Sequence, residues 1–320
     1  MSNTEPIRHI PVMLSEVVSY LKPPRHKIVF ADCTLGYGGH SQKLTEDFTE
    51  QDTLLGFDKD QDALTACQAL FANSTFSVRL IHQGFEDLRS FFEENPMDGA
   101  DYILFDCGFS SPQVDEAHRG FSFMRDGRLD MRLNQQQGIT AEEICAAWSE
   151  TQLADIFKNY GDERFSRRIA RAIVRRRQIE PLTSTQELAD LVLQAIPVKY
   201  QHQEGIHPAT RVFQALRIAV NDEIEVLRTG LQAALDYLRP GGRIGILTYH
   251  SLEHRVVKQL FSDYCGRCIC PPGMPQCGCG AHAKGTMVTR KPIRPCAAEI
   301  DRNPRSRSAQ FRVLERFMDE

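Results

Sequence analysis

The stretch Asp32-Cys-Thr-Leu-Gly36-Tyr-Gly38-Gly39-His40 decides the fold of this chain. It overlaps and follows the apolar, β-branched run Lys27–Thr34 (KIVFADCT), which predicts a short strand. Glycines allow the backbone to turn sharply and to approach a ligand closely. The helix expected after them presents free N–H groups at its start. We therefore expect a strand, a ligand-binding turn and a helix, with a glycine turn that binds nothing as the alternative.

Outward from this turn, strand-like and helix-like segments alternate through the first third of the chain. Three further apolar runs predict strands: Thr53–Asp58 (TLLGFD), Ser77–His82 (SVRLIH) and Asp101–Asp106 (DYILFD). Helical patterns such as Asp62–Phe71 lie between them. Strands that alternate with helices indicate βαβ units and a mostly parallel sheet, so we predict an α/β fold.

The alternation then stops, and residues from about 114 to 207 predict only helices. Thr140 with Glu143 makes a capping box at the start of one helix. Thr183 with Gln186 begins another. A long all-helical segment inside an α/β chain indicates an inserted subdomain.

The α/β pattern returns in the last third of the chain. It predicts a long helix at Ala209–Leu238 and a turn at Arg239–Gly242 (RPGG). A buried strand at Arg243–Tyr249 and a final strand at Ala309–Glu315 follow. We therefore predict an α/β domain formed by residues 1–113 and 208–320, interrupted by a helical insertion at residues 114–207.

Acidic residues at the ends of the predicted strands limit the choice of ligand. Asp58 closes the second strand, 22 residues after Gly36, where a carboxylate can accept hydrogen bonds from both ribose hydroxyls of a nucleoside cofactor. A dinucleotide fingerprint requires Gly or Ala where this chain has Ser41. S-adenosylmethionine (AdoMet) carries an ammonium group and no phosphate, so Asp32 beside the glycines favours AdoMet over NAD. Asp106, at the end of the fourth strand, can face the same cofactor.

The composition is that of an ordinary folded protein, with 320 residues, 42% of them hydrophobic, and a formal net charge of −4. A nucleic-acid partner is therefore predicted only from local clusters. Seven arginines lie between Arg164 and Arg177; they suit phosphate groups, and a solvated helix face is the alternative. The chain shows no signal-peptide pattern at its start and no run near the roughly 18 apolar residues of a membrane helix. We expect a cytoplasmic protein with no membrane association.

Several long motifs go beyond these general patterns. They are His9–Met13 (HIPVM), Gly38–Ser41 (GGHS), Asp106–Asp115 (DCGFSSPQVD), Arg119–Gly127 (RGFSFMRDG), Leu129–Arg132 (LDMR), Tyr160–Phe165 (YGDERF), His207–Arg211 (HPATR), His250–Glu253 (HSLE) and Asn303–Ser308 (NPRSRS). With this set the chain resembles the RsmH-type (MraW) methyltransferases of bacteria over essentially its whole length. The set is specific, whereas the glycine turn alone would not be.

The resemblance implies a Rossmann-like class I AdoMet-dependent methyltransferase domain with an inserted all-helical, substrate-recognition subdomain. It implies N4-methylation of a cytosine in the decoding (P-site) region of 16S rRNA in the small ribosomal subunit. It assigns the methionine part of AdoMet to the turn, the ribose to Asp58 and the adenine to Phe85. Asp106 is the candidate catalytic residue and also a cofactor contact. The complete set of implied cofactor contacts is Gly38, Gly39, His40, Asp58, Phe85, Asp106 and Gln113.

The expected chemistry needs acceptors for the protons of a cytosine amine, whose lone pair is delocalised into the ring. We look for these acceptors in the loop Asp106–Gln113. The Asp/Asn/Ser-Pro-Pro-aromatic motif common in amino-methyltransferases is not present, because the chain reads Ser110-Ser-Pro-Gln113. The family's usual Leu-Asp-Leu-Gly-Val is Phe105-Asp-Cys-Gly-Phe109 here, and its usual Phe-His-Ser-Leu-Glu-Asp-Arg is Tyr249-His-Ser-Leu-Glu-His-Arg255.

Six of the ten cysteines fall between residues 265 and 296. The candidate ligands of a structural zinc ion are Cys268, Cys270, Cys277 and Cys279, because two closely spaced pairs of thiolates can complete a tetrahedral site. Reduced thiols without a metal are the alternative, since C-x-C pairs are less typical than C-x-x-C.

Three other functions compete with rRNA methylation. The first is a methyltransferase that acts on DNA or another RNA, for which the same cofactor site would serve. The second is a ribosome-assembly factor that senses AdoMet and binds RNA without turnover. The third is an NAD oxidoreductase, which Ser41 and the lack of an evident hydride-transfer constellation disfavour. The sequence gives no prediction of the oligomeric state.

Overall fold

The computed structural model describes residues 11–22, 27–108, 116–201, 207–271 and 278–319. The chain divides into two compact units, one formed by Met1–Gly108 with Ile224–Glu320 and one formed by Phe109–Glu223. Each unit has its own buried core, an α/β core in the first and a helical core in the second.

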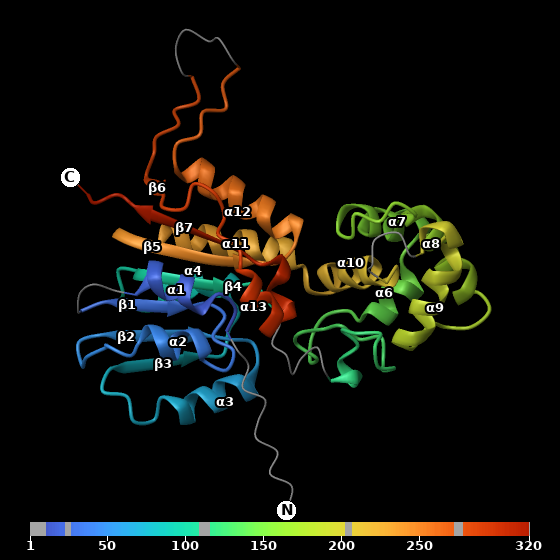
Figure 1. Ribbon diagram of the computed structural model, residues 1–320, viewed down its shortest axis with the longest axis horizontal. Coiled ribbons are helices and arrows are strands. Elements are labelled where there is room, and N and C mark those ends of the chain that lie inside the picture. The colour runs from blue at the N-terminus through green and yellow to red at the C-terminus, as the bar shows by residue number, and fades with distance from the viewer. Residues whose placement is uncertain (1–10, 23–26, 109–115, 202–206, 272–277, 320) are drawn as a thin grey trace, which may run out of the picture. The chain divides into compact units, whose positions relative to one another are not determined.

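The first unit contains a seven-stranded sheet in the order β3-β2-β1-β4-β5-β7-β6 (Figure 1). Its strands are Val29–Asp32 (β1), Thr53–Phe57 (β2), Ser77–Ile81 (β3), Ala100–Asp106 (β4), Leu238–Thr248 (β5), Gly285–Met287 (β6) and Gln310–Arg316 (β7). Strands β1 to β5 pair in parallel, and β7 runs antiparallel to β5 and β6. This sheet confirms the predicted Rossmann-like fold.

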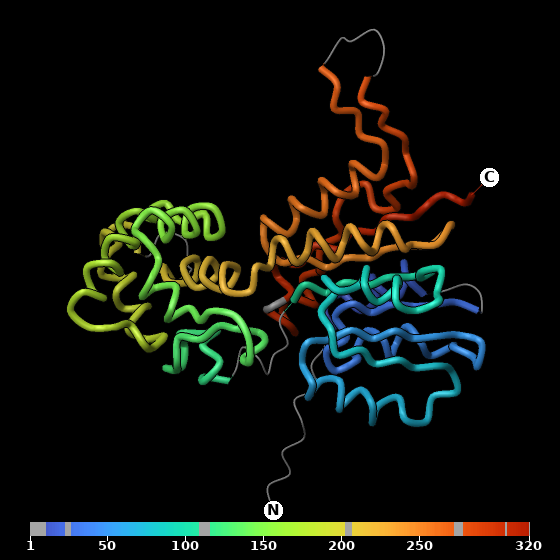
Figure 2. Tube along the Cα trace, turned by 180° about the vertical axis from the view of Figure 1, so that it is seen from behind, coloured from blue at the N-terminus to red at the C-terminus, as the bar shows by residue number. Residues whose placement is uncertain are grey.

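Helices cover both faces of the sheet, because successive side chains of a strand point to opposite faces and both sets are apolar here. One face packs against α1 (Leu14–Leu21), α2 (Gly39–Leu44) and α3 (Gln61–Leu70). The other packs against α4 (Leu88–Glu94), α11 (Glu223–Asp236) and α12 (Ser251–Tyr264). The same sheet is seen from behind in Figure 2.

The predicted turn at residues 239–242 lies inside β5 rather than before it. Ala100 pairs with Leu238 and Tyr102 with Arg243, so four residues of β5 bulge opposite the single residue Asp101. The Nη1 atom of Arg239 lies 3.0 Å from Asp101 Oδ2 and fastens the bulge to β4. The short strand β6 at the sheet edge was not predicted, because a three-residue strand leaves no periodic pattern in the sequence.

The second unit contains no strand of the sheet among its described residues. Its α-helices are α6 (Ala141–Ala147), α7 (Glu150–Asn159), α8 (Ser166–Arg177), α9 (Thr185–Ala195) and α10 (Ala209–Asn221). The predicted capping box at α6 is present, since Thr140 Oγ1 accepts from the Glu143 N–H and Glu143 accepts from the Thr140 N–H. Helix α9 begins one residue later than predicted, with Ser184 and Glu187 as its capping box.

The long helix predicted at residues 209–238 is two helices. Asp222 adopts a left-handed conformation with φ 47° and ends α10, and its backbone N–H donates to the Ile218 carbonyl. Val212 and Leu216 of α10 are buried in the helical core of the second unit. The division between the units therefore falls at Glu223, later than the boundary at residue 207 that we expected from the sequence.

The remaining elements are short: η1 (Phe85–Asp87), η2 (Ala117–Arg119), η3 (Val198–Tyr200), α13 (Ala297–Arg302) and η4 (Pro304–Ser308). Among the described residues, no helix combines the length and the apolar character that crossing a membrane requires.

Candidate cofactor site at the carboxyl edge of the sheet

Four acidic or hydroxyl side chains meet at one edge of the sheet because parallel strands end on the same side. Asp32 is the last residue of β1 and Asp106 the last of β4. Asp58 follows β2, and Tyr249 follows β5. The carboxyl edge of an open α/β sheet, near the point where the strand order reverses, is the usual place for a ligand. Here that point lies between β1 and β4.

The glycine turn, residues 32–41, is tightly packed at two of its three glycines. Gly38 has φ +77°, and a Cβ atom there would lie 2.8 Å from Leu70 Cδ2 of α3. A Cβ atom at Gly39 would lie 2.5 Å from Pro11 Cγ. Gly36, with φ +50°, has no such neighbour, since only the Thr34 carbonyl comes within 4.0 Å of its Cβ position. The turn is thus held from outside while the backbone at Gly36 stays open to a ligand.

Asp58 joins the glycine turn to the end of β2. Its Oδ2 accepts from the Gly36 N–H at 2.7 Å, and its Oδ1 accepts from the Asp60 N–H at 2.8 Å. Burial raises the pKa of Asp58 above its ordinary value, although these backbone donors lower it. Each carboxylate oxygen has a second lone pair. Asp58 can therefore position the turn and still accept hydrogen bonds from hydroxyl groups.

Asp32, the first residue of the turn, is buried, with 1% of its surface exposed. Its Oδ2 accepts from the Ser41 hydroxyl at 2.6 Å, and its Oδ1 accepts from the Thr34 N–H at 3.1 Å. Burial raises the pKa of Asp32 to about 6, against the Ser41 hydrogen bond that lowers it. Residues 32–42 contain no Lys or Arg. A cationic ligand group would therefore stabilise the ionised form of Asp32.

Asp106 is hydrogen-bonded on one side of its carboxylate. The hydroxyl of Tyr249 donates to Oδ1 at 2.7 Å, and the Gly108 N–H donates to the same oxygen at 3.1 Å. The other oxygen, Oδ2, lies 3.8 Å from His40 Nδ1. The backbone N–H of Asp106 donates to Thr34 Oγ1 at 2.6 Å, which ties β4 to the glycine turn. Oδ2 is thus the oxygen that faces away from the fixed donors.

Tyr249 is a site residue that the sequence analysis missed. Burial and the adjacent Asp106 carboxylate raise the pKa of its hydroxyl well above the ordinary value, so the phenol stays protonated and donates. Tyr249 stands where the resembling family has Phe, and this departure was the available signal in the sequence.

Phe85 lies in η1, after the end of β3, and its ring is partly buried. It packs edge-to-face on Phe105 of β4, with ring centroids 5.5 Å apart. A Cβ atom at Gly230 of α11 would lie 2.5 Å from Phe85 Cδ2. These contacts fix the ring on the face of the sheet that carries α11. Gln113, the remaining expected contact, lies outside the described residues.

The profile of the MraW methylase family matches residues 6–317. The chain belongs to the MraW methylase family. The chain is 40% identical to a protein of Halothermothrix orenii named ribosomal RNA small subunit methyltransferase H, over 98% of this chain and 100% of that protein. It is 45% identical to a protein of the same name in Heliobacterium mobile, over 97% of this chain and 99% of that protein. Among solved structures, an rRNA methylase from Streptococcus thermophilus superposes with a TM-score of 0.40 at 10% identity, over 95% of this chain and 94% of that one.

In this member of the MraW family, the segment after β5 begins α12 with a capping box. His250 is the N-cap residue, and Glu253 accepts from the N–H groups of Tyr249 and His250 at 2.6 and 3.2 Å. His254 Nδ1 lies 2.6 Å from Thr248 Oγ1, and burial lowers the pKa of His254 to about 4, so its imidazole is neutral at pH 7. The capped helix start fixes the backbone of Tyr249 and hence the donor on Asp106.

The arginines of α8 divide into structural and exposed groups. Arg177 donates to the carbonyls of Cys145 and Trp148 at 2.8 and 2.6 Å and thereby caps the end of α6. Arg176 pairs with Glu180 at 2.9 Å. Arg168 and Arg175 are exposed and line a hollow on α8. Arg167 is exposed as well, and the exposed Arg171 pairs with Glu150 at 3.2 Å. The accessible basic face of α8 therefore includes Arg167, Arg168 and Arg175.

Proposed function

We propose that this protein transfers a methyl group from AdoMet to the N4 amine of a cytosine in the decoding (P-site) region of 16S rRNA, in the small ribosomal subunit. The observation that carries the proposal is the Asp106 carboxylate, whose Oδ1 holds two donors while Oδ2 faces away from them, at the carboxyl edge beside the glycine turn. The family membership and the names of the curated relatives support the substrate.

The side chains at this edge fit AdoMet. Asp58 would hold the ribose hydroxyls, and the open backbone at Gly36 with Gly38, Gly39 and His40 would hold the methionine part. The buried Asp32 would face the ammonium group, which a pyrophosphate cofactor lacks. Phe85 would lie against the adenine. AdoMet supplies a methyl group already activated on a sulfonium, so the protein need not activate the donor.

The work left to the protein is to position and polarise the amine of the base. Orientation of two reactants can contribute up to roughly 7–11 kcal/mol of barrier reduction. Asp106 Oδ2 would accept a hydrogen bond from one N–H of the exocyclic amine. This hydrogen bond would localise the nitrogen lone pair toward the methyl group, and the carboxylate would then receive the proton that the amine releases. Tyr249 and Gly108 hold the opposite oxygen of Asp106 and so fix the direction of Oδ2.

A stacked and paired base cannot reach this edge, so the cytosine must be unpaired or flipped out. The helical unit would bind the surrounding rRNA. Its exposed Arg168 and Arg175 suit phosphate, because the guanidinium group makes forked hydrogen bonds to phosphate oxygens. These exposed guanidinium groups support a substrate-recognition role for the second unit.

The test incubates purified protein with AdoMet and unmodified small subunits, followed by digestion of 16S rRNA and mass spectrometry. N4-methylcytidine at one decoding-site cytosine is the expected result. The matched variant is Asp106→Asn. A fall in turnover at saturating AdoMet with cofactor Kd unchanged within about threefold supports a catalytic role, whereas a raised Kd with normal turnover would leave Asp106 only a cofactor contact. Cofactor binding without any methylated base would instead favour an AdoMet-sensing assembly factor.

The RNA-binding face has a separate test. The double variant Arg168→Gln, Arg175→Gln should bind the small subunit more weakly. The slope of log K against log salt concentration should become shallower by about 1–2, because fewer phosphate contacts form and fewer counterions are released on binding. Arg176→Gln is the control, because its guanidinium already pairs with Glu180. An unchanged slope in the double variant would make this a solvated helix face.

A further inference from the structure

The cysteine excursion, residues 265–284, connects the end of α12 to the start of β6. Its described residues extend away from the sheet in Figure 1, where they are orange. Its base is closed by an antiparallel bridge between Cys265 and Ala283 and by the Lys284 N–H, which donates to the Tyr264 carbonyl at 2.9 Å. None of the described residues from 265 to 284 is buried. Hydrophobic burial therefore does not explain how the described residues of the excursion are held in place.

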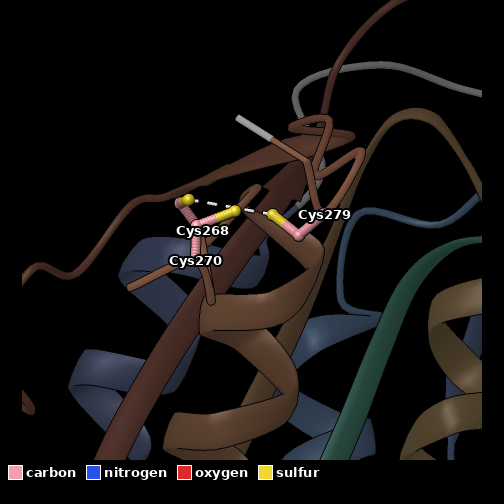
Figure 3. A group of neighbouring side chains, drawn as sticks. All are labelled: Cys268, Cys270 and Cys279. Carbon is pink, nitrogen blue, oxygen red and sulfur yellow. Dashed lines mark hydrogen bonds between the residues drawn. The ribbon is translucent and has the colours of Figure 1, made fainter. Parts of the chain in front are cut away.

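Three thiol groups meet within the excursion. The Sγ atoms of Cys268, Cys270 and Cys279 all lie within 4.8 Å of one another. They come from the two arms of the excursion, and Figure 3 shows their side chains pointing toward one another. Cys268 Sγ and Cys279 Sγ are 3.7 Å apart. A disulfide bond is about 2.05 Å long, so these two sulfur atoms are not bonded. A regular tetrahedron with Zn–S bonds of about 2.3 Å has edges of about 3.8 Å, which matches the observed separation.

The surroundings favour a thiophilic metal such as zinc over Mg²⁺ and Ca²⁺. Residues 265–284 contain no Asp or Glu, so the excursion offers none of the carboxylate ligands that Mg²⁺ and Ca²⁺ prefer. The Gly278 N–H lies 3.3 Å from Cys270 Sγ and donates to it, as backbone amides do to metal-bound thiolates. The sequence supplies a further thiol at Cys277, which lies outside the described residues.

We propose that the cysteine excursion binds one Zn²⁺ ion through the thiolates of Cys268, Cys270 and Cys279. Each thiol loses its proton to solvent as its sulfur bonds to the metal, and no electron is transferred. The ion joins the two arms of the excursion. Its role is structural, because the excursion belongs to the other end of the sheet. Gly285 pairs with Arg316, and the adjacent Glu315 pairs with Arg243, which lies opposite Tyr102 near the start of β4.

The experiment measures zinc in the full-length protein, purified under reducing conditions without chelator and without a metal-binding tag. Elemental analysis should find about one zinc ion per chain. Cys268→Ser and Cys279→Ser should each lose most of it, while Cys296→Ser, which removes an exposed cysteine outside the excursion, should retain it. Far-UV circular dichroism verifies that the serine variants are folded. Replacement of zinc by cobalt should give a thiolate-to-cobalt charge-transfer band in the wild type and in Cys296→Ser, and should not give it in Cys268→Ser.

Two outcomes would overturn the proposal. One is a wild-type protein that holds less than about a tenth of an equivalent after incubation with Zn²⁺ and desalting. The other is zinc retained at the wild-type level by the Cys268 and Cys279 variants.

Limited trypsin digestion gives an independent readout, since Arg267 and Lys284 are exposed. The zinc-loaded protein should resist cleavage after these residues and the chelator-treated protein should be cut there; equal cleavage of the two forms would also count against a zinc that joins the arms.

Discussion

The glycine turn and the cysteine excursion both bring polar side chains together, but they differ in what holds them. The turn is packed between Pro11 and α3, and its Ser41 hydroxyl and Gly36 N–H donate to the carboxylates of Asp32 and Asp58, which fastens it to the sheet. The excursion has no buried residue among those described. A site that forms part of the core is preorganised by folding itself, whereas a site outside the core needs its own cross-link, which we propose is zinc.

A pair of glycine substitutions gives the largest expected difference between the two regions. Gly38 and Gly280 both have positive φ, +77° and +62°, but only Gly38 has neighbours within 4 Å of its Cβ position. Gly38→Ala should lower the free energy of unfolding by roughly 2–4 kcal/mol, from backbone strain and from overpacking against Leu70. Gly280→Ala should cost no more than about 1 kcal/mol, from strain alone.

Urea denaturation followed by far-UV circular dichroism measures both glycine variants. Trp148 is the single tryptophan and lies in the helical unit, so its fluorescence provides an internal reference for the part of the protein that neither change touches. Equal losses of stability in the two variants would contradict the distinction between a packed turn and an open excursion.

The pH dependence of stability tests whether the turn is truly part of the core. Burial raises the pKa of Asp32 to about 6, above its ordinary value of 3.8. Below pH 3.8 the carboxyl is protonated in both the folded and the unfolded state, so burial carries no charge penalty. As the pH rises to about 6, the unfolded state ionises first and stability falls, by about 3 kcal/mol in all.

Asp32→Asn isolates this contribution. The amide keeps an oxygen for the Thr34 N–H and cannot ionise, so the variant should lack this fall in stability, and its difference from the wild type should grow between pH 4 and 6. Denaturation curves at a series of pH values provide the measurement. A difference that does not change with pH would show that Asp32 is not held in a dry environment.

Asp58 gives the smallest of the expected effects and concerns binding. Asp58→Ala removes the acceptor for the Gly36 N–H and the proposed acceptor for the ribose. The Kd for AdoMet should rise at least tenfold, which corresponds to about 1.4 kcal/mol. Asp62→Asn, an exposed acid on the adjacent helix, should change it less than twofold. Calorimetry that finds the same Kd for Asp58→Ala and wild type would remove Asp58 from the cofactor site.

Much of the fold was predicted correctly because it depends on local patterns. An apolar run before the glycines marked β1, apolar runs ending in acids marked β2 and β4, and a Thr-x-x-Glu spacing marked the start of α6. The break at Asp222 was not predicted, because a single aspartate inside a helical pattern does not indicate the end of a helix. The left-handed backbone at Asp222 results from the packing of α10 and α11 into different cores. The four-residue bulge in β5 was likewise predicted only as a turn, because its place inside the strand depends on pairing with β4.

The sequence by itself determined which residues are available at the carboxyl edge, since Asp32, Asp58 and Asp106 each follow an apolar run. The tertiary structure alone decided what each of them does. It buried Asp32 and raised its pKa, made Asp58 an anchor for Gly36, and placed the Tyr249 hydroxyl on Asp106 from a strand far along the chain. The physical reason is that burial and hydrogen-bond geometry depend on neighbours distant in sequence, whereas strand and helix periodicity depends on adjacent residues.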